Sequence, residues 1–369
     1  MRNEQTATRE RRGRLILANL PHAGEKKSVS WPPDAFRSKL PKMKTRSFND
    51  TGRVVSEVGL GCWQLGGTDW GKVEDAEGME ILDAAADAGV TFFDTADVYG
   101  NGRSESLIGR FLRERRDGFF VATKLGRTGD LYPDHYTERG VRAATEASLR
   151  RLELDALDLT QLHCVPPAVL RQGEIFDWLR QLKSEGKIHG FGASVESMEE
   201  AEICLRQEGL ESLQIIFNLF RQKPAETLFA EALRKRVALI VRLPLASGLL
   251  SGKLRKETSF PANDHRNYNR DGARFNVGET FAGLPYEKGV ELADALNAHV
   301  PEGFTMAQMA QRWILDHEAV TVIIPGASRP DQARANAAAS NLPPLGAETH
   351  RALRDFYTKE VARHIRGPY

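Results

Sequence analysis

Short apolar runs alternate with longer amphipathic segments along most of the chain. The apolar runs, which predict strands, are residues 58–62, 91–94, 119–124, 157–163, 188–194, 213–218, 238–243 and 320–324. The segments with helical spacing are residues 76–88, 104–115, 137–152, 174–185, 198–207, 225–235, 306–317 and 331–339. Consecutive parallel strands need such crossover helices, and eight strand–helix pairs close naturally into a single (β/α)8 barrel of the TIM type. An open, doubly wound sheet is the competing α/β arrangement.

Three further segments complete the predicted barrel. Residues 253–285, after the seventh strand, are polar and lack periodicity, which predicts a large loop on the C-terminal face, where long loops are commonly lids. Extra helices are expected at residues 287–298 and 347–361. The glycines at 59–66 and 100–102 miss the G-x-G-x-x-G spacing, so a dinucleotide fold of the open-sheet type is disfavoured.

The first 42 residues differ from the rest, with a basic run at residues 9–14 and a Trp-Pro-Pro turn at residues 31–33. We interpret residues 1–42 as a flexible N-terminal extension, or as translation upstream of a true start at Met43. An organelle transit peptide is disfavoured by four acidic residues in this segment. The barrel domain is assigned to residues 43–369.

Composition narrows the classes of partner. The chain has 369 residues and a formal net charge of +1, so no overall field attracts nucleic acid or a membrane surface. Its three cysteines are far apart and odd in number, which argues against a disulfide framework or a thiolate metal site. No apolar stretch approaches the ~20 residues of a membrane-spanning helix. We expect a cytoplasmic protein with a small-molecule substrate, no metal and an oligomeric state that the sequence leaves open.

Four residues with side chains able to take part in catalysis follow the second, third and fourth predicted strands: Asp94, Tyr99, Lys124 and His163. Strand ends present catalytic groups in barrels of this kind. Reduction of a carbonyl needs a hydride donor and an acid at the oxygen, and a tyrosine of solution pKa ~10 needs a nearby cation to act. Lys124 supplies the cation, Asp94 its counter-ion, and His163 a hydrogen bond to the substrate oxygen. Taken alone, each of these residues could serve only to cap a turn, pack in the core or face solvent. Their joint placement at the ends of three consecutive strands favours a catalytic role.

The motif F-D-T-A-x-x-Y-G-x-G-x-S-E at residues 93–105, the lysine ending the third strand and L-x-x-L-D-x-x-x-x-H resemble the aldo-keto reductase family. The resemblance covers about residues 45–339. It implies the Asp94, Tyr99, Lys124 and His163 tetrad, hydride transfer from a nicotinamide, and a hairpin near residues 48–55 that closes the bottom of the barrel.

The resemblance also implies the cofactor site. Its predicted residues are Cys62, Trp63, Asp94, Ser194, Gln214, Arg242, Pro244, Leu245, Ser247, Gly248, Lys253, Gly326, Ser328, Arg329, Gln332 and Asn336. Ser194 and Gln214 are expected at the carboxamide, and the 244–253 loop at the pyrophosphate. Ser328 and Arg329, before a helix N-terminus, are expected at the 2′-phosphate, which favours NADPH over NADH.

Gln332 and Asn336 are expected at the adenosine end. The chain departs from the family pattern at Arg242, where an aromatic residue often stacks on nicotinamide, and at Ala335, where a glutamate is common. Gly326 and the next residue replace the Lys-Ser pair of one large branch, so the chain looks closer to the branch of channel β-subunits and aryl-alcohol-dehydrogenase-like enzymes.

The predicted function is NADPH-dependent reduction of aldehydes or ketones to alcohols, and the reaction is expected to be reversible. The predicted substrate pocket consists of Trp63, Trp70, Tyr99, Tyr132 and His163, which suits aromatic or medium-sized carbonyls. An NADPH-binding, redox-sensing regulatory subunit with little turnover is the alternative. A barrel isomerase or aldolase with a Schiff-base lysine ranks last, because it leaves the tyrosine motif without a role.

Overall fold

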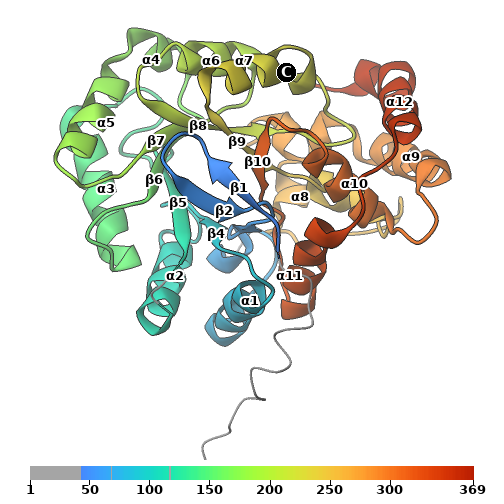
Figure 1. The fold of residues 1–369 in the computed structure, drawn as a ribbon, viewed down its shortest axis with the longest axis horizontal. Coiled ribbons are helices and arrows are strands. Elements are labelled where there is room, and N and C mark those ends of the chain that lie inside the picture. The colour runs from blue at the N-terminus through green and yellow to red at the C-terminus, as the bar shows by residue number, and fades with distance from the viewer. Residues whose placement is uncertain (1–42, 68, 116–117) are drawn as a thin grey trace, which may run out of the picture. The chain divides into compact units, whose positions relative to one another are not determined.

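The computed structural model describes residues 43–67, 69–115 and 118–369 of the chain (Figure 1). The predicted N-terminal extension lies outside the described residues. No helix within the described ranges is long and apolar enough to cross a membrane.

Eight parallel strands form the central sheet, in the order β10-β9-β8-β7-β6-β5-β4-β3. Their bounds are β3 (Leu60–Gly61), β4 (Phe92–Asp94), β5 (Phe120–Leu125), β6 (Leu159–His163), β7 (Phe191–Ser194), β8 (Leu210–Ile216), β9 (Ala238–Arg242) and β10 (Val320–Ile323). Nearly every residue in them is buried, as expected for strands covered by helices on the outside and packed within the barrel. This confirms the predicted parallel α/β sheet.

The first and last strands meet and close the sheet into a barrel. Parallel bridges join Val58 to Ile323 and Gly61 to Gly326, and the Gly61 backbone N–H donates to the Pro325 carbonyl at 3.1 Å. A side chain at Gly61 would place its Cβ only 2.7 Å from the carbonyl oxygen of Ile324. Glycine is therefore required here for the backbones to approach closely enough to close the barrel.

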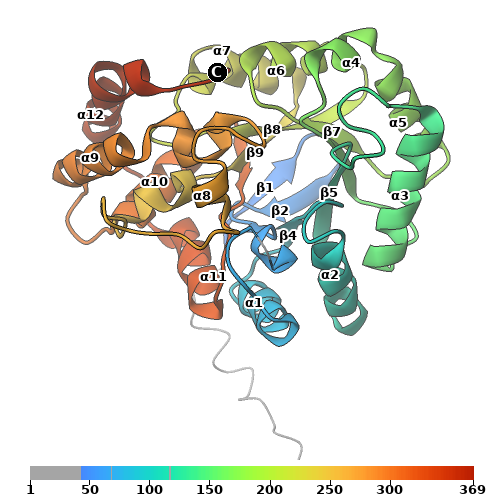
Figure 2. The same ribbon diagram turned by 180° about the vertical axis from the view of Figure 1, so that it is seen from behind.

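Helices surround the barrel, with α1 and α11 side by side where the ring of helices closes (Figures 1 and 2). The crossover helices are α1 (Asp75–Asp87), α2 (Arg103–Glu114), α3 (Glu138–Leu152), α5 (Glu174–Ser184), α6 (Met198–Leu205), α7 (Pro224–Lys235), α10 (Met306–Leu315) and α11 (Pro330–Ala337). Side-chain caps fix several starts: Thr137 accepts from the Gly140 N–H, and Thr305 begins α10 in a capping box with Gln308.

The predicted hairpin consists of β1 (Thr45–Phe48) and β2 (Arg53–Ser56), which pair antiparallel. It lies across one end of the barrel in Figure 1. Phe48 is fully buried against Phe92 and Phe120, with ring centroids 6.1 and 4.7 Å away. These rings belong to a core cluster inside the barrel, and the hairpin closes the end opposite to the strand ends that carry the candidate chemistry.

The sequence pattern misplaced some elements. Strand β8 begins at Leu210, three residues before the predicted 213–218, since the polar residues Glu211 and Ser212 interrupt its apolar pattern although both are buried. A short helix, α4 (Pro167–Gln172), was not predicted. The extra helices are α9 (Tyr286–Leu296) and α12 (Ala347–Phe356), the latter followed by a π turn. The predicted 253–285 loop is mainly irregular, but contains the one-turn α8 (His265–Tyr268) and two 3-10 turns.

Candidate active site

The structure brings the four predicted catalytic residues together at the C-terminal ends of β4, β5 and β6. Lys124 Nζ lies 2.6 Å from Asp94 Oδ1, 2.8 Å from the Thr95 carbonyl oxygen and 3.2 Å from the Tyr99 hydroxyl. The rings of Tyr99 and His163 meet edge to face, with centroids 5.9 Å apart. A phenol, an ammonium, a carboxylate and an imidazole therefore share one site, as the sequence predicted.

Asp94 is held by more than the lysine. Its Oδ2 accepts hydrogen bonds from Gln214 Nε2 at 2.6 Å and from Gln161 Nε2 at 3.3 Å. Lys124 and Asp94 are both nearly inaccessible, at 1% and 2% exposure. A buried ion pair is tolerated when further hydrogen bonds satisfy its polar atoms, and here they fix the position of the ammonium group beside Tyr99.

The electrostatics of Tyr99 differ from the sequence expectation. Burial raises the pKa of Tyr99 to about 12, and the charge of Lys124 lowers it only in part. Burial alone would lower the pKa of Lys124, but Asp94 and Tyr99 outweigh it and raise that pKa. The lysine thus remains an ammonium and the phenol remains protonated at neutral pH, which is the form a proton donor requires.

His163 is neutral in this environment. Burial, followed by the charges of Arg127, Lys124 and Arg242, lowers its pKa well below the usual value. Its Nδ1 has no hydrogen-bond partner within the described part of the chain. A neutral imidazole can donate one hydrogen bond to a substrate oxygen without adding charge.

A cavity of about 260 Å³ opens in front of Tyr99 and His163. Its lining residues are Trp63, Asp69, Val98, Tyr99, Arg127, Tyr132, His163, Tyr268, Arg274, Phe275 and Glu279. Trp63 stacks on Tyr99 with centroids 5.8 Å apart. Four of the five predicted pocket residues line this cavity.

Trp70 is the exception, because it does not line this cavity. It packs edge-on behind Trp63 at 5.6 Å and against His265 at 4.3 Å. The guanidinium of Arg266 lies 5.0 Å from its ring on another side. Trp70 therefore packs behind Trp63 and supports it. The sequence alone does not show which aromatic residue of a loop lines a cavity and which packs behind it.

Ser194 and Gln214 lie side by side at the ends of β7 and β8, in direct register. Ser194 Oγ is 3.5 Å from Gln214 Oε1. Arg242, at the end of β9, is 9% exposed, and its Nε has no partner among the residues that the structure describes. A serine hydroxyl, a glutamine amide and an unsatisfied guanidinium N–H fit the polar carboxamide of a nicotinamide.

The 244–253 segment, predicted to meet the pyrophosphate, follows β9 and includes Pro244, Leu245, Gly248 and the exposed Lys253. Gly248 has a positive φ of 99°. Ser247 is buried, and its hydroxyl donates to the Glu279 carbonyl at 3.2 Å and accepts from the Phe281 N–H at 3.1 Å. The Ser247 hydroxyl is thus already partnered by the long loop, and it must change partners to meet a phosphate.

The predicted adenosine end lies at the start of α11. Ser328 donates its Oγ to Gln332 Oε1 at 3.1 Å, and the exposed Arg329 pairs with Asp331 at 3.1 Å. The exposed guanidinium at this helix start fits a phosphate group. Asn336 instead lies buried, with its Nδ2 donating to the Gly326 carbonyl at 3.1 Å.

Cys62 is among the residues predicted for the cofactor site. Its side chain is fully buried, its N–H donates to the Asp94 carbonyl, and its carbonyl accepts from Ser104 Oγ. Both backbone groups and the thiol therefore already have partners in the core, and a cofactor contact by Cys62 stays a prediction.

Three charged residues beside the cavity were not predicted from the sequence: Arg127, Glu196 and Glu279. Arg127 Nη1 and Arg242 Nη1 lie 3.4 and 3.5 Å from Glu279 Oε1, and Arg127 Nη2 lies 3.6 Å from Glu196 Oε1. The only available signal was that Arg127 and Glu196 closely follow predicted strands. Glu279 comes from the aperiodic loop and gave none.

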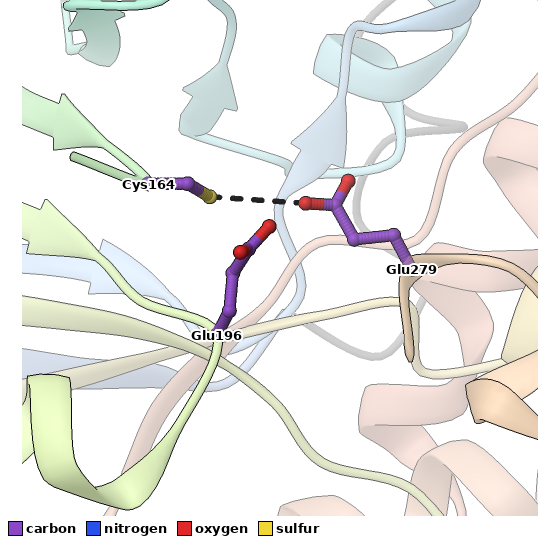
Figure 3. A group of neighbouring side chains, drawn as sticks. All are labelled: Cys164, Glu196 and Glu279. Carbon is purple, nitrogen blue, oxygen red and sulfur yellow. Dashed lines mark hydrogen bonds between the residues drawn. The ribbon is translucent and has the colours of Figure 1, made fainter. Parts of the chain in front are cut away.

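Cys164, Glu196 and Glu279 also point toward one another in a way that could suggest a metal site (Figure 3). The guanidinium groups of Arg127 and Arg242 already surround the Glu279 carboxylate. A divalent cation there would face two positive charges at close range, which Coulomb repulsion opposes. The arrangement suits a network of arginines and carboxyl groups rather than a metal.

The fold and these side chains define an α/β-barrel of the oxidoreductase type. The Aldo/keto reductase family model matches residues 57–358, and the chain belongs to this family. Aldo-keto reductase YhdN of Bacillus subtilis (strain 168) is 32% identical over 298 residues, which cover 79% of this chain and 87% of that protein.

Two further comparisons place the chain within the family. A probable voltage-gated potassium channel subunit beta of Arabidopsis thaliana is 28% identical over 319 residues, covering 82% of this chain and 93% of that protein. The solved structure of the glycerol dehydrogenase AKR11B4 from Gluconobacter oxydans has a TM-score of 0.70 and 29% identity, covering 88% of this chain and 97% of that one. The predicted barrel and the predicted branch of the family are thereby confirmed.

Proposed function

We propose that this protein reduces aldehydes or ketones to alcohols with NADPH, and that Tyr99 donates the proton. The observation that carries the proposal is the placement of Lys124 Nζ between Asp94 at 2.6 Å and the Tyr99 hydroxyl at 3.2 Å, at the cavity. The site therefore offers an acid next to a fixed cation, which is what a developing alkoxide needs.

Each residue has a separate task in this proposal. The cavity admits the carbonyl so that its oxygen faces the Tyr99 hydroxyl, and the neutral His163 donates a hydrogen bond to the same oxygen. When bound, the reduced nicotinamide supplies the hydride to the carbonyl carbon. Tyr99 then gives its proton to the oxygen, and Lys124 stabilises the resulting phenolate, while Asp94 keeps the ammonium group in place.

The proposed cofactor contacts come from three places on the rim. Ser194, Gln214 and Arg242 would hold the carboxamide end. The 244–253 segment would meet the pyrophosphate once the hydroxyl of Ser247 is released from the long loop. Arg329 supports a preference for NADPH over NADH, since an exposed guanidinium at a helix start suits an additional phosphate.

The likeness to a channel subunit favours a second candidate, an NADPH-binding regulatory subunit with little turnover. The complete arrangement of Asp94, Tyr99, Lys124 and His163 supports the enzyme instead, because a binding role alone gives this costly buried ion pair no task.

The test is steady-state oxidation of NADPH, and separately of NADH, with a panel of aromatic and aliphatic aldehydes. We expect turnover with several aldehydes and a lower KM for NADPH than for NADH. Binding of NADPH without turnover of any aldehyde would favour the regulatory subunit. Absence of binding of either nucleotide would end both candidates.

A further inference from the structure

Four charged side chains form a largely buried group beside the reacting end of the cavity: Arg127, Arg242, Glu196 and Glu279, called here the inner charge cluster. Glu279 Oε1 lies between the two guanidinium groups, at 3.4 Å from Arg127 and 3.5 Å from Arg242. Cys164 Sγ donates to the same oxygen at 3.7 Å. Figure 3 shows Cys164 and Glu279 facing each other, with the Glu196 side chain reaching toward them from below.

The inner charge cluster carries an excess positive charge. The carboxyl groups of Glu196 and Glu279 have oxygens within 4.8 Å of each other, and two carboxylates this close in a largely buried site resist being ionised together. Glu279 faces both guanidinium groups, whereas burial, followed by the Glu279 charge, raises the pKa of Glu196 to about 8, so the proton resides on Glu196. Two guanidinium groups thus face a single ionised carboxylate at neutral pH.

The cluster lies where a hydride must be delivered. Arg242 ends β9, and its guanidinium Nη2 donates to the Val195 carbonyl at 3.1 Å. Val195 directly follows Ser194, which ends β7. Arg127 lines the same cavity as Tyr99 and His163. A nicotinamide that delivers a hydride to a carbonyl carbon held at Tyr99 would therefore bind beside this excess charge.

The two redox states of the nicotinamide respond differently to such a charge. The oxidised ring carries a positive charge and the reduced ring is neutral. A nearby guanidinium therefore repels NADP+ but leaves the ring of NADPH unaffected, and the low dielectric of a buried site strengthens the effect. An aromatic residue at the position of Arg242, common in the family, would not make this distinction.

We propose that Arg242, together with Arg127 and opposed in part by Glu279, makes this site bind reduced nicotinamide cofactor in preference to the oxidised form. Arg242 is then a specificity-determining residue for the redox state of the cofactor. This inference rests on the proposed function, since it concerns the same nicotinamide site. Its consequence is rapid release of the oxidised cofactor after each carbonyl reduction.

The test is the ratio of the dissociation constants for NADP+ and NADPH, each measured by titration calorimetry at pH 7 on the full chain. We expect wild type to bind NADPH about tenfold more tightly, which corresponds to a modest repulsion between charges. Arg242→Met should bring the ratio to within about twofold of one, because it removes the charge and keeps an apolar side chain of similar length.

Two variants of the carboxyl pair separate charge from structure. Glu279→Gln removes the compensating negative charge, so the ratio should rise severalfold above that of wild type. Glu196→Gln is the matched control, since it replaces a protonated carboxyl by a neutral amide, and the ratio should stay within about twofold.

Equal changes in both dissociation constants, in Arg242→Met and in Glu279→Gln alike, would overturn the inference. The two variants predict opposite shifts, so a loss of folding in Arg242→Met, seen as a lowered Tm, still leaves the Glu279→Gln arm decisive. The outcomes also distinguish this inference from the proposed function. Equal affinities with normal aldehyde reduction contradict only the inference, whereas no binding of either cofactor contradicts the function.

Discussion

The tetrad and the inner charge cluster are neighbours, but they are held in different ways. In the tetrad, Lys124 and Asp94 come from the ends of adjacent strands and approach to 2.6 Å. In the cluster, Glu279 comes from a loop, and its contacts to arginines are 3.4 and 3.5 Å. Strand ends fix the ion pair beside Tyr99, and a loop residue adds charge next to it. In the proposed function, the first arrangement would determine whether reaction occurs, and the second how the cofactor is held.

The largest effect is expected from Lys124→Met. Without the ammonium group, the Tyr99 phenolate loses its stabilisation, and kcat for aldehyde reduction should fall by roughly 10²–10⁴-fold, the range of a general-acid contribution. The variant should also unfold more easily, by about 3–5 kcal/mol, because Asp94 remains as an unpaired buried charge. Steady-state kinetics and urea unfolding measure the two effects.

Lys72→Met is the matched control for this variant, since Lys72 is exposed and pairs with Glu74 at the surface. It should change neither kcat nor stability measurably. A Lys124→Met protein with wild-type kcat would contradict the proposal that the tetrad, unlike the inner charge cluster, is required for the reaction.

A smaller effect is expected at the adenosine end. Arg329→Met should raise the KM for NADPH by about 10–100-fold and leave the KM for NADH unchanged, since only NADPH carries the additional phosphate. Arg334→Met, an exposed arginine later in the same helix, serves as the control. An equal rise in KM for NADPH and NADH would show that Arg329 does not bind the 2′-phosphate.

Trp63 and Trp70 offer a finer comparison within the aromatic wall. Trp63 lines the cavity and stacks on Tyr99, whereas Trp70 lies behind it. Trp63→Leu should raise the KM for aromatic aldehydes by about 3–10-fold through lost ring contacts. Trp70→Leu should change it by less than about twofold. Steady-state kinetics with benzaldehyde and its ring-substituted analogues measures both effects. A larger rise in KM for Trp70→Leu than for Trp63→Leu would show that Trp70 lines the pocket.

The smallest change is expected from pH. The pKa of Tyr99 is raised to about 12, so the donor stays protonated as pH rises, and the lowered pKa of His163 keeps that ring neutral. The two groups proposed to contact the reacting oxygen therefore do not titrate between pH 7 and 9. The kcat/KM for an aldehyde at saturating NADPH should stay level across this range. A tenfold fall per pH unit above 8 would show that the phenol is more acidic than its burial indicates.

The sequence predicted the barrel and the tetrad because both follow from patterns that are local. Each strand is a short apolar run, and Asp94, Lys124 and His163 occupy strand ends, whose position in a closed barrel determines that they meet. Trp63, Trp70 and Tyr132 were predicted to line the pocket as aromatic residues of the mouth loops, and the cavity is lined by Trp63 and Tyr132 but not by Trp70. Closure of the barrel at Gly61 is consistent with the pattern but was not visible in it.

The remaining features depend on how the long loop folds back. Glu279 reaches Arg127 and Arg242 only because 3-10 turns at Val277–Glu279 and Phe281–Gly283 bring the loop over the rim. No periodic pattern encodes that path. The burial of Cys62 and the position of Trp70 are likewise set by packing between distant segments, which a single sequence does not display.

The central claim is that Tyr99 protonates a carbonyl oxygen beside a reduced nicotinamide. Its most direct test is Tyr99→Phe, with the dissociation constant for NADPH and the single-turnover rate of aldehyde reduction measured on the same preparation. We predict that NADPH binds within about twofold of wild type, while the reduction rate falls by at least 10²-fold. Aldehyde reduction at the wild-type rate in this variant would contradict the account.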